Sequence, residues 1–455
     1  MAGRGQDAHS LQSLLPASPI DRVTLPFRRF LAIESSSGLL LAVCTFAALV
    51  LANSPWRAEF AALWEWPCRV GIGAWVLEKD LLHVINDGLM TVFFFVIGLE
   101  IKRELVAGEL RDVRQAVLPI MAAIGGMVVP ALVYVGLRDV LGVSDDARRG
   151  WAIPMATDIA FVVGLLALFG RRVPSSLRIF LLTLAIVDDL GAILIIAFVF
   201  TESLNLAALA VGVGAALLTW LLNRLGVRNV GVYTLVGGVA WIGVLKAGIH
   251  PTVAGVVLGL MTPARSWIPM SALAEILDKI QNRLDSLPQA AEISPKLIRQ
   301  ARFAIRESVS PLERLEHLLH PWVAFVIMPV FALANAGVEI RLSALAEPVA
   351  LAIAAGLALG KPVGILLFCG AAVLLRIARL PADVPWSVLA GGAVLSGIGF
   401  TMSLFHAGLA LPATLLDAGK VGTLLGSTLS TLAGMGLLWH SLPRVATGQP
   451  DELPN

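Results

Sequence analysis

The sequence is poor in charge and in cysteine. Asp, Glu, Lys and Arg make up 15% of its 455 residues, whereas hydrophobic residues make up 57% and the mean hydropathy is +0.82. A soluble domain typically carries about 25% charged residues, so this composition excludes an ordinary globular enzyme and predicts an integral membrane protein. Cys44, Cys68 and Cys369 have no spacing typical of a disulfide framework or a metal site. The first 35 residues contain no apolar core, so we expect no cleavable signal peptide.

Apolar runs long enough to cross a bilayer recur along the whole chain, since about 20 apolar residues suffice for one helical span. We place spans at about residues 36–53, 83–101, 116–137, 151–169, 177–200, 205–222, 231–246, 248–263, 321–340, 348–375, 387–410 and 421–441. The pattern predicts an all-α integral membrane protein with about 12 transmembrane helices. They form one domain over residues 31–445, between tails at residues 1–30 and 446–455.

The basic residues are unevenly distributed between the two ends of these spans. Most of the 34 Lys and Arg residues fall in the N-terminal tail and in the even-numbered loops. The positive-inside rule therefore places both termini and the even-numbered loops in the cytoplasm.

Two segments between spans are long enough to carry structure of their own. Residues 64–79 alternate in part and contain central glycines, which predicts a short β-hairpin on the outer side. An exposed hairpin edge can pair with a second copy, so we expect a homodimer. Residues 264–320 form a charged cytoplasmic loop, in which helical spacing of apolar residues from Leu273 to Leu284 indicates an amphipathic helix on the membrane or on the protein. A second helical stretch is expected from about Pro295, and a regulatory role of the loop stays open.

Two adjacent acids, Asp188 and Asp189, lie inside an apolar run of membrane-spanning length. Ionisable residues are costly there and usually mark an ion or proton pathway. Two unit charges about 5 Å apart repel each other by about 3 kcal/mol at an effective dielectric near 20. Such a pair favours binding a proton or a small hard cation, which is the minimum that cation/proton exchange requires.

A third acid, Asp158, follows Thr157 in a short span that also contains Pro154. A proline and a hydroxyl beside an acid predict a helix that is broken in mid-membrane. The span at 387–410 has a similar character, because it contains Gly391, Gly392, Ser396, Gly397, Gly399, Thr401 and Ser403. Paired interrupted spans in two halves of a chain indicate inverted repeats with discontinuous helices at the site. Close helix packing is the alternative explanation for the glycines.

The two repeats would comprise spans 3 to 5 and spans 10 to 12. Gly125, Gly126 and Pro130 would then face the segment 360–364. Lys361 in that segment needs a buried partner, because a charged lysine at mid-depth in a membrane is costly. Asp158, Asp188 and Asp189 are the candidates.

Four motifs together resemble the NhaA-type sodium/proton antiporters of bacterial inner membranes. They are Ala156-Thr157-Asp158-Ile159-Ala160-Phe161, Ala185-Ile186-Val187-Asp188-Asp189-Leu190-Gly191-Ala192, Gly360-Lys361-Pro362 and Gly397-Ile398-Gly399-Phe400-Thr401-Met402-Ser403. The likeness runs from about residue 30 to 440. It implies a multi-pass protein that exports Na⁺ or Li⁺ in exchange for more than one proton and is activated at alkaline pH. No cofactor is expected.

The resemblance also implies roles for single residues. Asp188 and Asp189 would bind the cation and the protons, and Thr157 and Asp158, at the crossing of two interrupted helices, would also belong to the ion- and proton-binding residues. Lys361 would balance charge there, or pair with Asp188 in the absence of sodium. Residues of a cytoplasmic pH response would be Glu100, Arg103, Glu104, Arg314, Glu316, His317 and His320, and His250 matches a further position linked to that response. The segment 264–310 is longer than the family's usual connection.

Other functions compete with exchange. A cation/solute symporter or a cation channel could also use acids inside spans, and the residues do not reveal the direction of coupling. An intramembrane aspartyl protease needs two acids on separate helices. Neither Tyr134 nor Tyr233 precedes an Asp, and no Gly-x-Gly-Asp occurs, so the protease is disfavoured.

Overall fold

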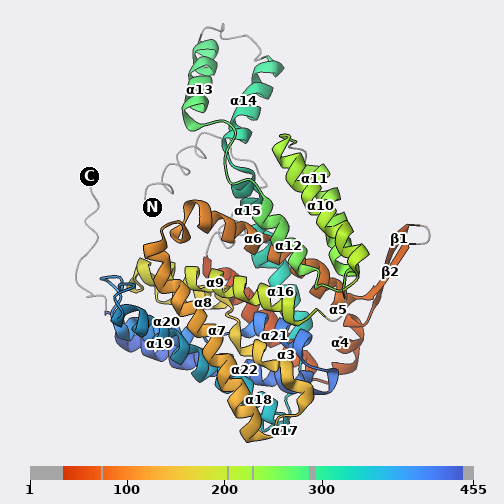
Figure 1. Cartoon of the computed structure of the whole chain (residues 1–455), viewed down its shortest axis with the longest axis vertical. Helices are drawn as coiled ribbons and strands as arrows, with labels where there is room; N and C mark the ends of the chain where they lie inside the picture. The colour runs from red at the N-terminus through yellow and green to blue at the C-terminus, as the bar shows by residue number, and fades with distance from the viewer. Residues whose placement is uncertain (1–33, 73–74, 202–203, 228–229, 286–293, 444–455) are drawn as a thin grey trace.

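The computed structural model describes residues 34–72, 75–201, 204–227, 230–285 and 294–443, most of which are helical (Figure 1). The predicted tails at 1–30 and 446–455 lie outside these residues. A helix satisfies its own backbone hydrogen bonds, which is what an apolar chain in lipid requires.

Within the described residues, seven continuous helices are long and apolar enough to cross a bilayer. Four of the seven are single α-helices, namely α7 (Val113–Leu141), α9 (Ser175–Val199), α10 (Leu206–Arg224) and α22 (Ala413–Ser441). The other three each contain a π-helical stretch between two α-helices. They are α5 (Leu81–His83) with η1 (Val84–Leu89) and α6 (Met90–Ala107); α15 (Pro311–Trp322) with η5 (Val323–Ile327) and α16 (Met328–Asn335); and α18 (Pro348–Ala355) with η6 (Gly356–Gly360) and α19 (Lys361–Leu374).

Three further pairs of apolar helices are bent at a short break. α3 (Glu34–Ala52) and α4 (Arg57–Trp64) meet at 119°, η3 (Asp145–Met155) and α8 (Ile159–Leu168) at 42°, and α20 (Trp386–Leu395) and α21 (Phe400–Ala410) at 46°. Two shorter apolar helices are α11 (Val230–Lys246) and α12 (Thr252–Met261). A helix as short as α12 rises only about 15 Å, half the thickness of the hydrocarbon core. The number of twelve membrane crossings therefore stays a prediction.

The remaining elements are small or stand outside the bundle. They are β1 (Pro67–Ile72), β2 (Trp75–Asp80), η2 (Glu109–Arg111), η4 (Gly170–Arg172), α13 (Met270–Asp285), α14 (Pro295–Ser308) and α17 (Leu342–Leu345). β1 and β2 pair antiparallel from Pro67 opposite Asp80 to Ile72 opposite Trp75, which confirms the predicted hairpin. Both helical stretches predicted in the segment 264–320 are also present, as α13 and α14. Figure 1 shows this helical pair standing apart from the other helices.

Two predicted spans begin well before their expected first residue. The span expected at 321–340 begins ten residues earlier, at Pro311, and its helix ends at Asn335. Ser310 starts it with a capping box, in which its hydroxyl accepts the Glu313 N–H at 3.2 Å and Glu313 accepts the Ser310 N–H. The charged first turns of this helix were mistaken for loop. The last span likewise begins at Ala413, so Lys420 lies in a helix rather than in a loop.

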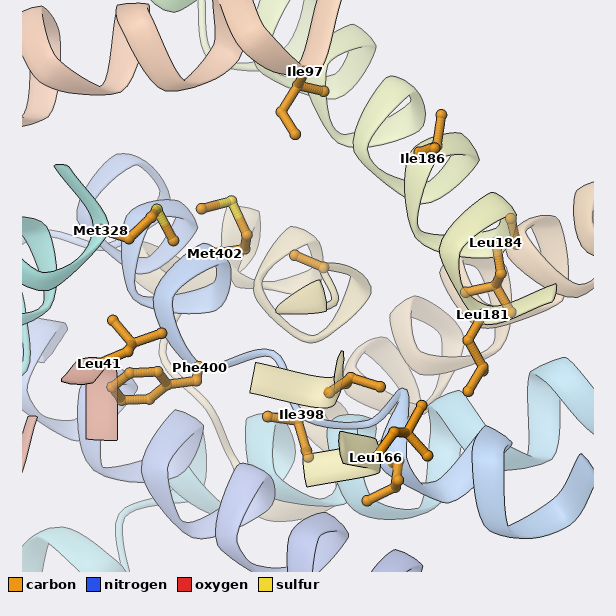
Figure 2. Packing of buried hydrophobic residues seen from close by; sticks show 14 of the residues in the cluster. Leu41, Ile97, Leu166, Leu181, Leu184, Ile186, Met328, Ile398, Phe400 and Met402 are labelled. Carbon is orange, nitrogen blue, oxygen red and sulfur yellow. The ribbon is translucent and has the colours of Figure 1, made fainter. Parts of the chain in front are cut away.

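The apolar interior surrounds the breaks of two bent pairs, η3–α8 and α20–α21, hereafter called the two bent pairs. Figure 2 shows Ile398, Phe400 and Met402, at and after the break between α20 and α21, among buried residues that include Leu166 of α8 and Leu181 of α9. The polar groups at the breaks are therefore enclosed by hydrocarbon side chains. In such surroundings a polar group needs a partner within the protein.

α7 and α19 pack directly against each other, as the glycine pattern predicts. A Cβ atom on Gly364 would lie 2.1 Å from the carbonyl oxygen of Gly125, and one on Gly360 would lie 2.7 Å from the Cα of Pro130. Only glycine permits so close an approach of two backbones. This contact fixes where Lys361, which begins α19, enters the interior.

Candidate ion-binding site

The breaks of the two bent pairs lie against each other. The Asp158 N–H donates to the Ile398 carbonyl oxygen at 2.7 Å, which joins the extended residues before α8 to those before α21. A Cβ atom on Gly399 would lie 3.0 Å from the Ala156 oxygen, and one on Gly397 would lie 2.5 Å from the Leu357 oxygen. Gly399 therefore lets the two breaks approach each other, and Gly397 lets the break before α21 approach η6. The two interrupted helices expected from the polar and glycine-rich spans are thus bent pairs whose breaks are in direct contact.

Asp158 joins the N-termini of two helices. One carboxylate oxygen accepts the Phe161 N–H at 3.1 Å and caps α8, and the other accepts the Thr401 N–H at 3.1 Å in the first turn of α21. The Thr401 hydroxyl donates to the same second oxygen. Unpaired N–H groups give a helix N-terminus a partial positive charge, which a carboxylate offsets. Asp158 is 1% exposed, so both of its oxygens are used inside the protein.

Lys361 forms an ion pair with Asp188, which decides among the three candidate partners. Its Nζ lies 2.6 Å from Asp188 Oδ2, and the two side chains are 0% and 1% exposed. The ammonium also donates to the carbonyl oxygen of Met155, at the C-terminal end of η3. Such an end carries partial negative charge, so the lysine is held by a carboxylate and a helix end together.

Thr157 connects this ion pair to the second break. Its hydroxyl lies 2.7 Å from Asp188 Oδ2 and 3.2 Å from the carbonyl oxygen of Ser396, the C-cap of α20. Asp188 Oδ2 therefore receives both Lys361 and Thr157. Asp188 Oδ1 is buried and has no hydrogen-bond partner among the described residues. Asp188 thus has one oxygen that receives two hydrogen bonds and one oxygen without a partner among the described residues.

Asp189 lies next to this pair on α9 and is unpaired. Its side chain is 4% exposed, and within the described residues it makes no hydrogen bond or ion pair. Burial of an unpaired carboxylate costs free energy unless it binds a proton or a cation. Asp189 and Asp188 Oδ1 together provide carboxylate oxygens, the ligand type that hard cations prefer. In the described part of the chain, no group of three or more His, Cys, Asp or Glu side chains is placed to hold a metal ion.

Some of the predicted pH-response residues come together where α6 meets α15. Arg103 forms an ion pair with Glu316 and lies 3.6 Å from Glu104. Glu100 lies one turn earlier on α6. Arg314 instead donates to the carbonyl oxygen of Arg306, and His317 and His320 are exposed. The structure therefore groups the α6 residues with Glu316 but does not bring the two histidines into the same contact.

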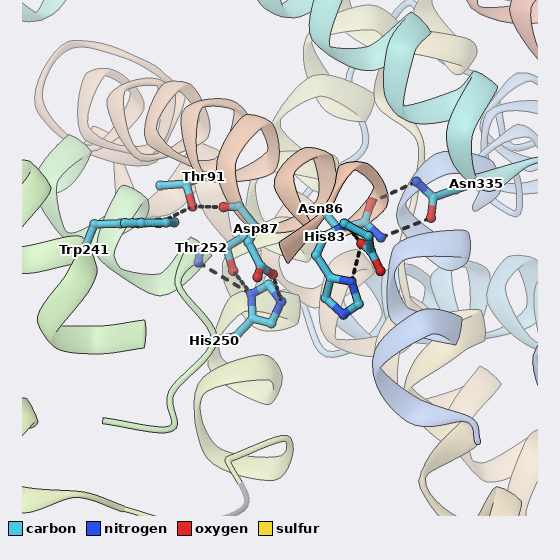
Figure 3. Close-up of polar contacts among 9 residues, drawn as sticks. His83, Asn86, Asp87, Thr91, Trp241, His250, Thr252 and Asn335 are labelled. Atoms are coloured by element: carbon cyan, nitrogen blue, oxygen red, sulfur yellow. Dashed lines mark hydrogen bonds and ion pairs between the residues drawn. The ribbon is translucent and has the colours of Figure 1, made fainter. Parts of the chain in front are cut away.

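His250 belongs to a different cluster, near the other end of the α5–α6 span (Figure 3). Its Nε2 lies 3.7 Å from Asp87 Oδ1, its Nδ1 lies 2.8 Å from the Thr252 hydroxyl, and its ring packs edge-on against Phe405. His250 is thus a packed side chain, not merely a solvated one at a helix end. Sequence reasoning missed Asp87, although an acid inside the apolar run at 83–101 was signal enough.

Further polar residues that were not assigned to the site form hydrogen bonds between elements. The Ser403 hydroxyl donates to the Ile153 oxygen at 2.7 Å, and Ser427 accepts the Phe400 N–H at 3.1 Å. Asn86 and Asn335 exchange amide hydrogen bonds between η1 and α16 (Figure 3). Their hydroxyl and amide groups lie inside apolar runs of the sequence, and this was the signal from which their buried contacts could have been predicted.

Comparison with known proteins agrees with this geometry. The profile of the family described as Na+/H+ antiporter 1 matches residues 28–438. The chain belongs to this family. Because the family consists of antiporters, the chain is a transporter and not an enzyme, which removes the intramembrane protease. Together with the apolar helices, this makes it a multi-pass membrane protein.

Several curated antiporters resemble the chain over almost their whole length. The Na(+)/H(+) antiporter NhaA of Rhodopirellula baltica is 51% identical over 436 residues, covering 94% of this chain and 97% of that protein. NhaA 2 of Acidiphilium cryptum is 47% identical, with 96% and 97% covered. NhaA of Rhizobium meliloti is 48% identical, with 93% and 96% covered. The resemblance inferred from four motifs is confirmed.

Proposed function

We propose that the protein exports Na⁺ or Li⁺ from the cytoplasm in exchange for entering protons. The relatives are named as Na(+)/H(+) antiporters, which supports these two substrates. The observation that carries the proposal is the unequal pairing of two adjacent buried carboxylates. Asp188 has Lys361 and Thr157 as partners, whereas Asp189 has none within the described residues. One acid is thus neutralised by the protein and the other is left for a transported ion.

Competition for the same oxygens couples the two flows. With protons scarce, Asp188 and Asp189 are free to bind a dehydrated Na⁺, with the Thr157 hydroxyl as a further ligand. The cation would displace the Lys361 ammonium from Asp188, because both positive charges compete for one carboxylate. After the site opens to the outside, protons displace the cation and the lysine returns to Asp188. Neither step needs a cofactor.

The site also supports electrogenic exchange. Two carboxylates and one lysine can together change their protonation by more than one proton, whereas one Na⁺ brings a single charge. Each cycle would then move net positive charge inward, so that the membrane potential as well as the pH gradient drives export. Asp158 would not bind the cation directly but hold the N-termini of α8 and α21 around it, since both of its oxygens are occupied.

Activation at alkaline pH would use the contact between α6 and α15. The Arg103–Glu316 ion pair joins these two helices, with Glu100 and Glu104 beside it. A change of charge in this group would alter how the two helices pack, and Arg314, His317 and His320, which also lie on α15, would act on the same packing. His250, paired with Asp87 at a distance from this group, would influence the response from the other end of the α5–α6 span.

In the proposed arrangement the protein lies in the bacterial inner membrane with both termini cytoplasmic. It would cross the membrane twelve times, with inverted repeats that place the two bent pairs at mid-depth. The positive-inside distribution supports this orientation. The hairpin β1–β2 would join two copies into a dimer, because its outer edges are free to pair. Deleting residues 67–80 should give monomers in detergent, as judged by light scattering.

The decisive experiment measures cation-dependent proton movement in inside-out vesicles. The lumen is acidified by respiration, a fluorescent dye reports its pH, and NaCl, LiCl or KCl is added across a pH series. Parent protein should give dequenching with Na⁺ and Li⁺ that grows toward alkaline pH, and Asp188→Asn should give none. No cation-dependent signal at any pH would instead favour a symporter or a channel.

A further inference from the structure

A cleft lined by charged, polar and apolar side chains opens beside several helix ends, and no residue of the ion site lines it. It has a volume of about 820 Å³, within the range of small-molecule sites. The turn before α7, the first turns of α7 and α9, and the turn between α19 and α20 line it. These helix ends belong to even-numbered loops, so the cleft lies at the proposed cytoplasmic interface.

Three arginines and two acids line this cleft, and within the described residues their charged side chains do not pair with one another; one Asp112 oxygen accepts the backbone N–H of Arg114 at 3.0 Å and caps α7. Arg114, Arg376 and Arg379 are exposed, and their guanidinium groups make no hydrogen bond or ion pair to any described residue. Glu109 and Asp112 line the same cleft. Cationic and anionic groups that share a cleft but stay apart suit a ligand that carries both charges.

Arg376 occupies its position against backbone preference. Its φ is 59°, and it is the one residue other than glycine with a positive φ in the described part of the chain. After α7, α8, α10 and α11 the left-handed position is taken by Gly142, Gly170, Gly226 and Gly248. A side chain in this conformation costs free energy that glycine avoids. An arginine here therefore indicates that its guanidinium has a use.

Exposed aliphatic side chains lie in the cleft and next to it in the sequence. Ile377 and Ile179 line it and are 54% and 43% exposed, and Leu374 and Leu375, which directly precede Arg376, are 83% and 66% exposed. In a membrane protein such side chains contact lipid tails. Charged groups beside a lipid-facing rim are the arrangement expected where a headgroup lies in a pocket and its acyl chains follow the helices.

We propose that this cleft binds a phospholipid with an amine headgroup. The three arginines would hold the phosphate, because guanidinium groups bind phosphate oxygens well. Glu109 and Asp112 would accept hydrogen bonds from the headgroup ammonium and disfavour a purely anionic lipid or free phosphate. The bound lipid would fasten the ends of α7, α9 and α19 together at the interface.

Native mass spectrometry of the full chain tests the proposal. The purified protein is titrated with phosphatidylethanolamine, phosphatidylglycerol, phosphatidylcholine, glycerophosphoethanolamine or inorganic phosphate. Phosphatidylethanolamine should bind most tightly, and the two ligands without acyl chains should bind weakly. Equal binding of phosphatidylglycerol and phosphatidylethanolamine would overturn the assignment of the headgroup.

Arg376→Gly is the most informative variant, because it removes the guanidinium while favouring the native backbone. One basic group near a membrane surface contributes about 1 kcal/mol, so binding of phosphatidylethanolamine should weaken about fivefold. The melting temperature in lipid-free detergent should be unchanged or higher, and the rise caused by the lipid should shrink. Arg376→Lys should weaken binding less than Arg376→Gly does.

Two further variants serve as controls. Glu109→Gln should reduce the preference for phosphatidylethanolamine over phosphatidylglycerol. Arg265→Gln removes an exposed arginine outside the cleft and should leave lipid binding as in the parent. Parental binding by Arg376→Gly, or an equal loss in Arg265→Gln, would overturn the proposal.

Discussion

Lys361 Nζ and Asp188 Oδ2 lie 2.6 Å apart where neither side chain has appreciable contact with solvent. Two further groups converge on this pair, the Met155 carbonyl on the lysine and the Thr157 hydroxyl on the aspartate. The ion pair therefore joins α19 to α9 through the break between η3 and α8. Any ion that takes the place of Lys361 at Asp188 must also loosen these contacts, which links occupation of the site to the arrangement of the helices.

Lys361→Met should destabilise the protein strongly, because it leaves the Asp188 carboxylate buried without its cation. Removing one member of a buried ion pair typically costs about 3–5 kcal/mol. The double variant Asp188→Leu with Lys361→Met removes both charges and should recover much of the loss without recovering exchange. Thermal unfolding of the purified protein measures the effect. If Lys361→Met melts at the parental temperature, the pair is not formed in the resting protein.

Asp189→Asn should abolish sodium-dependent proton movement while leaving the melting temperature nearly unchanged. The amide has almost the shape of the carboxylate, and Asp189 makes no hydrogen bond or ion pair to a described residue that would be lost. Asp278→Asn, on the exposed surface of α13, is a matched control and should exchange normally. The vesicle assay compares the three proteins under identical energisation. Substantial Na⁺-dependent dequenching in Asp189→Asn would exclude this residue from the site.

The site could be located from sequence because polar residues inside apolar runs are rare. Asp158, Asp188 and Lys361 stood out for this reason, and the structure brings the acids and the lysine to two adjoining helix breaks. The glycines of the segment 397–399 likewise indicated where two backbone segments approach each other closely. The free-energy cost of burying ionisable groups in a membrane thus identifies candidate site residues before any fold is known.

Pairings between distant helices could not be predicted in the same way. Helical periodicity orders side chains only along one helix, so it left three partners open for Lys361 and gave none for His250. The start of α15 was misplaced for a related reason. Its charged first turns resemble loop in composition, and the helix there depends on the Ser310 cap and on packing of Glu316 against Arg103.

Thr401→Val should destabilise the crossing of the two bent pairs. It keeps the side-chain shape and the backbone bond to Asp158 but removes the hydroxyl that donates to the same carboxylate oxygen. A hydrogen bond to a charged group contributes about 1.5–3 kcal/mol, so the melting temperature should fall. Thr183→Val is the control, because the Thr183 hydroxyl bonds only to Ile179 in its own helix. Equal melting of the two variants would argue against a special role of Thr401, whereas Thr401→Ser should resemble the parent.

Two glycines of α19 offer a matched test of the packing that positions Lys361. A Cβ atom on Gly364 would lie 2.1 Å from the Gly125 carbonyl oxygen, whereas one on Gly370 would have no neighbour within 4 Å. Both changes to alanine raise helix propensity by up to about 1 kcal/mol. Gly370→Ala should therefore be neutral or slightly stabilising, and Gly364→Ala should lower the melting temperature because α7 and α19 must move apart.

The same displacement should impair transport in Gly364→Ala, although glycine carries no functional group. Lys361 begins α19 one turn before Gly364, so a shift of this helix moves the ammonium relative to Asp188. We expect reduced Na⁺-dependent dequenching in vesicles for Gly364→Ala at equal expression, and parental dequenching for Gly370→Ala. If both variants exchange and melt like the parent, close contact between α7 and α19 does not set the position of the lysine, and the ion pair must be held by Thr157 and Met155 alone.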